Sequence, residues 1–183
     1  MSILKVARMG HPVLRTKART VDKLELKQPT VQDFIDSMVD TMFEYSGVGL
    51  AAPQVHESLR MFVAMLDADG QGEGDATVFI NPEITAIGDQ TVEGWEGCLS
   101  IPDIRGRVLR AQHVKVSALD RAGKRFELDL KDFPARVVQH ENDHLDGVLF
   151  FDRMKSLGTL TYLEEYSRYH ARREKDEDEE EDE

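Results

Sequence analysis

Two histidines four positions apart stand in the chemically most informative run of the sequence, His140-Glu141-Asn142-Asp143-His144. In a helix, residues i and i+4 lie one turn apart on the same face, so both imidazoles can reach one cation. Glu141 lies on the neighbouring face, where it can take a proton from a water bound to that cation. The run therefore predicts the ligands and the base of a metal-dependent hydrolase. A polar helix face that carries two unrelated histidines is the alternative.

A catalytic metal site needs a third protein ligand and an open position for water. The longer pattern His-Glu-x-x-His-x-x-Gly-x-x-His fails here, because Gly147 fits it but Phe150 stands where its last histidine would be. Glu164 stands twenty residues after His144, a spacing that suits thermolysin-like endopeptidases. Cys98 is the other candidate, since a thiolate binds soft and borderline cations strongly. Spacing alone places Cys98 modestly ahead of Glu164.

Both candidates also have non-catalytic explanations. A single free cysteine is often an inert buried residue, and the segment around Glu164 fits a solvated helix face equally well. A purely structural metal domain is a third possibility. Such a site prefers four closed ligands, and no fourth suitable residue stands at short spacing. The residues alone leave these alternatives open.

A glycine-rich run, Gly47-Val48-Gly49-Leu50-Ala51-Ala52-Pro53-Gln54, is the other unusual segment. Its two glycines allow a backbone to approach a ligand closely. Gln54 supplies an uncharged amide donor that suits a developing oxyanion. The alternative is a helix end at Gly47 in left-handed geometry, followed by a tight loop.

Length and composition indicate a single domain. The chain has 183 residues, enough for a single domain with a sizeable core, and it contains one cysteine. A single cysteine cannot form an internal disulfide, which agrees with a reducing compartment. The sequence contains no apolar stretch of about 20 residues, so we expect no membrane span. The N-terminus lacks the apolar region of a secretory signal. We therefore expect a cytoplasmic protein that does not associate with membranes.

The net charge of −12 is concentrated at the C-terminus. Residues 174–183 contain nine carboxylates and one lysine, a net of −8, which leaves about −4 for the remainder. Such a like-charge block predicts a disordered tail, so we expect a single catalytic domain over residues 1–173 and a disordered acidic tail over 174–183. No basic stripe interleaved with aromatic residues supports direct sequence-specific nucleic-acid binding.

The spacing of apolar residues predicts three helices and several strands. One helix covers Val31–Phe43, with Thr30 as its N-cap and Gly47 as its stop, and a second carries the histidines from about residue 133 to residue 145 and ends at Asp146-Gly147. A third is expected over about residues 160–173. Strands are predicted at residues 61–66, 77–80, 83–87, 114–119 and 126–130, the last two joined by a turn at residues 121–124.

This order of elements indicates an α+β fold with mostly antiparallel sheets. The sheets are expected to pack around a central metal-binding helix. The helix over residues 31–43 and the C-terminal helix are expected to flank them.

Three motifs in order resemble those of the peptide deformylase family: Gly-Val-Gly-Leu-Ala-Ala-Pro-Gln, Glu-Gly-Cys-Leu-Ser and Gln-His-Glu-Asn-Asp-His-Leu-Asp-Gly. The similarity extends from about Gly10 to Phe150, and the helical segment after the last motif resembles the bacterial type I branch. The resemblance implies an enzyme that removes the formyl group from the N-terminal methionine of newly made proteins. N-formylmethionyl nascent peptides would then be its substrates.

The resemblance also implies roles for individual residues. It makes Cys98, His140 and His144 the metal ligands and Glu141 the general base and acid. It implies one divalent metal, with Fe²⁺ expected and Zn²⁺, Ni²⁺ or Co²⁺ able to occupy the site. Hydroxide formed on the metal would attack the formyl carbon and release formate.

Oxyanion stabilisation and substrate contacts follow from the same resemblance. Gln54 and the backbone N–H of Leu99 would hold the oxyanion, and Gly49 would offer a backbone contact to the peptide. Three further positions match those near the substrate in this family: Val48, Arg105 and Val137.

The resemblance implies one further partner. Type I relatives use basic residues of the C-terminal helix to dock at the ribosome, and Arg168, Arg172 and Arg173 stand in the corresponding segment here. The acidic tail follows at once, so repulsion from ribosomal phosphates is expected to weaken this contact.

Overall fold

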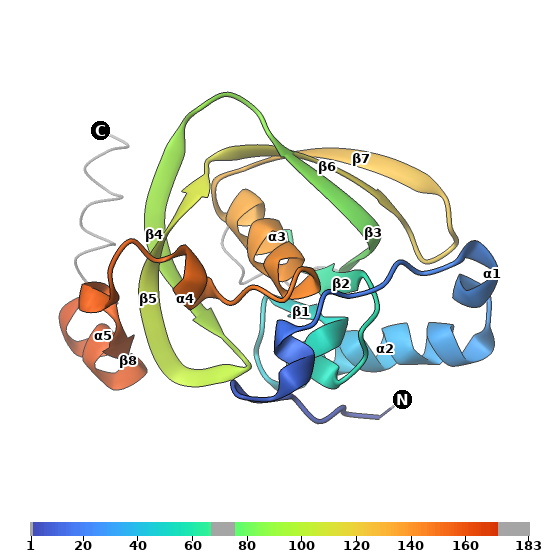
Figure 1. Cartoon of the computed structure of the whole chain (residues 1–183), viewed down its shortest axis with the longest axis horizontal. Helices are drawn as coiled ribbons and strands as arrows, with labels where there is room; N and C mark the ends of the chain where they lie inside the picture. Colours follow the sequence, from blue (N-terminus) through green and yellow to red (C-terminus); the bar gives the residue numbers. More distant parts are fainter. Residues whose placement is uncertain (1, 67–75, 172–183) are drawn as a thin grey trace.

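The computed structural model describes residues 2–66 and 76–171, which form two antiparallel sheets and a small number of helices (Figure 1). The larger sheet has five strands in the order β1-β2-β3-β6-β7: β1 (Gly49–Ala51), β2 (Met61–Ala64), β3 (Thr77–Ala86), β6 (His113–Leu119) and β7 (Arg125–Lys131). The smaller sheet has the order β4-β5-β8: β4 (Thr91–Cys98), β5 (Ile101–Ala111) and β8 (Thr161–Tyr162). The α-helices are α1 (Lys23–Leu26), α2 (Pro29–Glu44), α3 (Asp132–Leu145), α4 (Phe150–Arg153) and α5 (Leu163–Tyr169). Three 3₁₀-helices complete the described part: η1 (Pro12–Arg15), η2 (Ala52–Val55) and η3 (Leu157–Thr159).

Helix α3 lies between the two sheets. It contacts β1, β2, β3, β6 and β7 of the larger sheet and β5 of the smaller one. In Figure 1 the strands arch around this helix. Because α3 is covered on several sides, polar residues of its histidine motif are buried, including His140, Glu141, Asp143 and His144. The fold is therefore α+β with antiparallel sheets, as the sequence predicts.

Three apolar clusters hold these layers together. The first packs α2 against β1 and β2, with Ile35, Met38 and Met42 fully buried. The second packs α3 against the larger sheet and includes Phe62 and Phe79, whose rings stack at 4.5 Å. The third joins the N-terminal segment, β5 and α4. The methionines of α2 are thus core residues. No helix in residues 2–66 and 76–171 is long and apolar enough to cross a membrane.

Most predicted elements are present with shifted ends. Helix α2 covers the predicted segment but begins at Pro29, so the prediction of Thr30 as N-cap was wrong; Gln28 occupies that position without a side-chain cap. The two strands predicted at residues 77–80 and 83–87 form one strand, β3, because a register shift between Ile80 and Glu83 interrupts the alternation without ending the pairing.

Two features of the smaller sheet were not predicted. The long β4–β5 hairpin was missed because buried positions in it include Glu96 and Arg110, which break the apolar alternation expected of a strand. The last helix begins only at Leu163, because residues 161–162 pair with β5 as β8. The predicted end of that helix and the acidic tail lie outside the described residues.

Gly147 follows Asp146, the C-cap of α3, and offers a test of local packing. Its φ is +73°, and a Cβ there would lie 2.8 Å from the backbone carbon of Arg15. Gly88 has the same φ of +73° but open space around it. We expect Gly88→Ala to lower the free energy of unfolding by about 1 kcal/mol, the cost of a left-handed alanine. Gly147→Ala should cost about 3 kcal/mol, because backbone must also move. Urea unfolding would measure the free energy of unfolding of both variants. Equal losses of stability would contradict the packing argument.

Candidate active site

Three side chains from two distant segments converge at the site. His140 and His144 come from α3, and their rings lie 5.0 Å apart between centroids. Cys98 is the last residue of β4, where a register shift after Gly97 interrupts the pairing with β5. The Cys98 Sγ lies 3.3 Å from His144 Nε2. One ligand atom from each of the three residues lies within 4.8 Å of the others, so the cluster can hold a metal ion.

The donor set suits a divalent transition metal. A sulfur and a nitrogen bound to one tetrahedral cation lie about 3.6 Å apart, given usual bond lengths, which is close to the distance seen here. Three protein ligands also leave a coordination position for water or substrate. Glu164 is not part of this cluster: its side chain is 78% exposed, and it accepts a hydrogen bond from Arg168. The thermolysin-like alternative therefore has no support in the described part of the chain.

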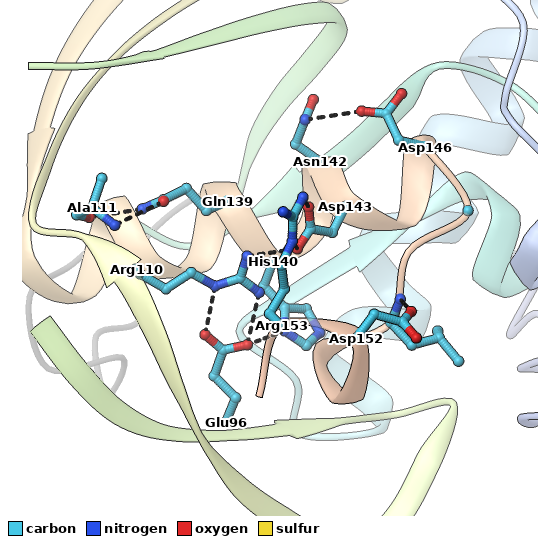
Figure 2. Close-up of polar contacts among 12 residues, drawn as sticks. Glu96, Arg110, Ala111, Gln139, His140, Asn142, Asp143, Asp146, Asp152 and Arg153 are labelled. Atoms are coloured by element: carbon cyan, nitrogen blue, oxygen red, sulfur yellow. Dashed lines mark hydrogen bonds and ion pairs between the residues drawn. The ribbon is translucent and has the colours of Figure 1, made fainter. Parts of the chain in front are cut away.

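Glu96 orients His140 by contacting the Nδ1 atom of its ring (Figure 2). Its carboxylate lies 2.8 Å from His140 Nδ1, which leaves Nε2 to face the cluster. Arg110 donates two hydrogen bonds to the same carboxylate, and Arg136 donates a third. Burial raises the pKa of Glu96, but the hydrogen bonds from Arg110 and His140 outweigh burial and hold its pKa well below the ordinary value. The carboxylate is therefore charged, as expected of a group that orients a metal-binding histidine.

Asp143 continues this polar network away from the histidines. It accepts hydrogen bonds from Arg110 and from Arg153, whose Nη2 lies 2.7 Å away. Arg110 thus lies between two buried carboxylates, those of Glu96 and Asp143. Asp143 is linked to His140 through Arg110 and Glu96.

Gln54 is held in one orientation beside Cys98. Its Oε1 accepts a hydrogen bond from the backbone N–H of Ala51 at 2.8 Å. Its Nε2 consequently points toward Cys98 Sγ at 3.4 Å and Ser100 Oγ at 3.3 Å. Gln54 as a whole is 1% exposed. A donor fixed in this way can stabilise a negative oxygen beside the cysteine.

Glu141 packs against the glycine-rich segment. A Cβ on Gly49 would lie 2.4 Å from Glu141 Oε1, so only glycine admits the carboxylate at this position. Glu141 Oε2 is buried and has no hydrogen-bond partner among the described residues. Burial raises the pKa of Glu141 to about 7, where a carboxylate can both accept and return a proton near neutrality.

The surroundings shift the pKa values of the two histidines in opposite directions. Burial lowers the pKa of His144 well below its ordinary value, which favours the neutral form that binds metals. Burial also lowers the pKa of His140, but hydrogen bonds with Cys98 and Glu96 outweigh it and leave this pKa well above the ordinary value. A cation that binds His140 must therefore displace a proton. The Nδ1 of His144 has no hydrogen-bond partner in the described chain.

The remaining predicted residues lie around this centre. Leu99 begins the two-residue turn after Cys98, and its side chain approaches Gly47. Val137 is buried in the second apolar cluster, against which Val48 packs. Arg105 lies across Gly97, opposite it in the β4–β5 pairing.

Several residues of the site were not found from the sequence. Arg110 and Arg136 stand outside the motifs. Ser100 ends the motif Glu-Gly-Cys-Leu-Ser, but the motif does not predict its contact with Gln54. Glu96 and Asp143 stand inside the motifs, but nothing in the sequence identifies them as the partners that orient the histidines. A single sequence carries no signal for the partners of a buried charge, because those partners come from other strands and helices.

A Cys–His–His cluster beside a buried glutamate, on an antiparallel α+β scaffold, defines a metal-dependent hydrolase. A family model described as polypeptide deformylase matches residues 3–159. The chain belongs to this family, whose members remove the formyl group from the N-terminus of nascent proteins.

Individual relatives and solved structures also support membership of this family. Peptide deformylase 2 of Nostoc sp. is 44% identical over 169 residues, which cover 90% of this chain and 93% of that protein. The peptide deformylase of Halothermothrix orenii is 43% identical over 160 residues, covering 86% of this chain and 97% of its own. The crystal structure of class I type b peptide deformylase from Acinetobacter baumannii, bound to Met-Ala-Ser, has a TM-score of 0.78 and 41% identity. It covers 84% of this chain and 99% of that one.

The contact between Glu96 and His140 can be tested by removing the charge of the carboxylate. We expect Glu96→Gln to weaken metal binding by about 10- to 100-fold, because His140 loses its charged partner. Glu93→Gln is the matched control, since Glu93 lies on the same strand but pairs with Arg107. Titration with a chelator would measure both affinities. Equal metal affinities for the two variants would contradict an orienting role.

Proposed function

We propose that Cys98, His140 and His144 bind the catalytic metal and that α3 is the central metal-binding helix of the fold. The convergence of the three donor atoms within 4.8 Å is the observation that carries this proposal. Fe²⁺ is the proposed metal in the cell, with Zn²⁺, Ni²⁺ or Co²⁺ as possible occupants in purified protein. When bound, such a cation lowers the pKa of a coordinated water and polarises a carbonyl.

Glu141 moves the protons of the reaction. Its carboxylate takes one from the attacking water and returns one to the leaving amine of methionine. The pKa of about 7 suits both transfers. Burial against Gly49 keeps the carboxylate away from bulk water, so its proton is exchanged at the reacting centre.

Gln54 Nε2 and the backbone N–H of Leu99 stabilise the oxyanion that forms on the formyl oxygen. Gln54 is suited to this role because Ala51 fixes its amide with the donor toward Cys98. Removing one such donor typically costs about 10²–10³ in kcat.

The substrate is an N-formylmethionyl peptide in this proposal. The Acinetobacter relative bound to Met-Ala-Ser supports it, because that peptide corresponds to a deformylated product. Gly49 would contact the peptide through its backbone. Val48 and Val137 would form apolar walls for the methionine side chain, and Arg105 would lie near the following residues.

Two further expectations remain proposals. We place the enzyme in the bacterial cytoplasm, with residues 1–173 as its catalytic domain. A ribosome contact through α5 is opposed by the acidic tail, and Arg168 is already engaged with Glu164 and Glu165.

Formate release from a formyl-Met peptide tests the assigned roles. Glu141→Gln should retain the metal and lose about 10²–10⁴ in kcat, because the amide cannot carry protons. Cys98→Ala should lose both metal and activity, whereas Glu164→Ala should keep both. Metal content is measured on protein purified without air. Full metal and activity in Cys98→Ala, together with their loss in Glu164→Ala, would overturn the ligand assignment.

The effect of the tail is a separate prediction. Deleting residues 174–183 removes a net charge of −8 and should increase co-sedimentation of the enzyme with ribosomes. The effect should be larger at low salt, because exposed charges are screened as ionic strength rises. Unchanged co-sedimentation at low salt would show that the tail does not control this contact.

A further inference from the structure

The side-chain amide of Gln54 is held at both of its ends, and Ser100 holds the nitrogen end. The backbone N–H of Ala51 donates to Oε1 and fixes the oxygen end. A primary amide has two N–H groups, and the two neighbours of Nε2 are Ser100 Oγ at 3.3 Å and Cys98 Sγ at 3.4 Å. Ser100 is fully buried, so bulk water does not compete for its hydroxyl group. One N–H of Gln54 is thus bound within the protein, and the other faces the cysteine.

The N-terminal segment ties together the two backbones that carry Gln54 and Ser100. The N–H of Ala7 donates to the carbonyl oxygen of Gln54 at 2.7 Å, and the N–H of Met9 donates to that of Ser100 at 2.8 Å. Between them, the N–H of Arg8 has no hydrogen-bond partner in residues 2–66 and 76–171. Residues 7–9 therefore bridge η2 and the turn after β4, although Gln54 and Ser100 are 46 positions apart in the sequence.

This bridge restricts the direction in which Gln54 can donate. The terminal torsion of a glutamine side chain is only weakly restrained by itself, so its amide plane is set by hydrogen bonds. Here Ala51 and Ser100 set that plane from opposite ends. A donor that is already oriented needs no reorganisation when negative charge develops beside it.

We propose that Ser100 is a positioning residue for oxyanion stabilisation and that residues 7–9 hold it against Gln54. This inference rests on the proposed function, in which Gln54 Nε2 and the Leu99 N–H stabilise the formyl oxygen. Ser100 acts through Gln54 and not on the substrate. Leu99 lies in the same turn as Ser100, so the bridge also fixes the spacing between the two oxyanion donors.

Hydrogen exchange at the Gln54 side chain tests the orientation of the amide without any turnover. In the zinc-loaded, full-length enzyme, we expect Ser100→Ala to speed exchange of one Gln54 amide proton by about tenfold, because its acceptor is lost. The resonance is identified by its absence from Gln54→Ala. Ser37→Ala is the matched control, since Ser37 is also buried but donates to the carbonyl oxygen of Asp33 within α2.

Kinetics test whether this orientation matters for the reaction. Ser100→Ala should lower kcat for formyl-Met-Ala-Ser by about tenfold and change KM by less than about twofold, because the oxyanion forms only in the transition state. In a Gln54→Ala background, Ser100→Ala should lower kcat by no more than about twofold, because the amide through which Ser100 acts is gone. Ser37→Ala should leave kcat unchanged.

Proline substitutions test the bridge, because proline has no backbone N–H. Ala7→Pro should lower kcat by about tenfold and speed exchange at Gln54, since the Gln54 backbone loses its contact with the N-terminal segment. Arg8→Pro is the matched control and should change neither. If Ala7→Pro does not fold, exchange of backbone amides in the wild type replaces it. Those of Ala7 and Met9 should then exchange slowly and that of Arg8 fast.

Four results would overturn the proposal. They are unchanged exchange at Gln54 in Ser100→Ala, an undiminished effect of Ser100→Ala in the Gln54→Ala background, equal effects of Ala7→Pro and Arg8→Pro, and fast exchange of the Ala7 and Met9 amides. The exchange measurements need no catalysis, and formate release by the wild-type enzyme reports the deformylase activity separately. A failure of the positioning role is thus distinguishable from a failure of the proposed function.

Discussion

The buried carboxylate of Glu96 is the constraint on which the site depends. A charge at this depth is stable only if it is paired and hydrogen-bonded, and two arginines and one histidine fulfil this need. These partners come from β5 and α3, so one carboxylate ties the smaller sheet to the helix that carries the histidines. Breaking such a buried pair typically costs about 3–5 kcal/mol. The same contacts that stabilise the interface between β4 and α3 therefore also orient His140.

The side chains of two proposed ligands, His140 and Cys98, are held by contacts within the protein. His140 is oriented by Glu96, and the thiol of Cys98 is approached by the amide of Gln54. Gln54 is in turn held by Ala51, at the end of β1. Helix α3 thus faces segments from both sheets: η2, directly after β1, carries the amide donor, and the end of β4 carries the thiol. A site held in this way loses little freedom when a cation binds.

Local patterns predicted those parts of the fold that are stabilised by local or apolar contacts. The spacing of Ile35, Met38 and Met42 predicted α2, and the histidine spacing predicted the face of α3 that is buried. The β4–β5 hairpin escaped prediction because its inward positions include Glu96 and Arg110, whose burial depends on each other. The pairing partner of a buried charge is set by tertiary contacts. Neither the alternation of apolar residues in a strand nor the β-propensity of a residue predicts this partner.

The glycine-rich segment shows how a residue without a side chain contributes to chemistry. The carboxylate of Glu141 occupies the space that a Cβ on Gly49 would fill, so strand β1 can approach α3 closely. That close approach also excludes water from Glu141 and raises its pKa to about 7. A Cβ at position 49 would displace the Glu141 side chain from this buried position, and a more exposed carboxylate would have a pKa closer to that of an ordinary glutamate. The absence of a Cβ at Gly49 therefore affects both the packing of β1 against α3 and the pKa of Glu141.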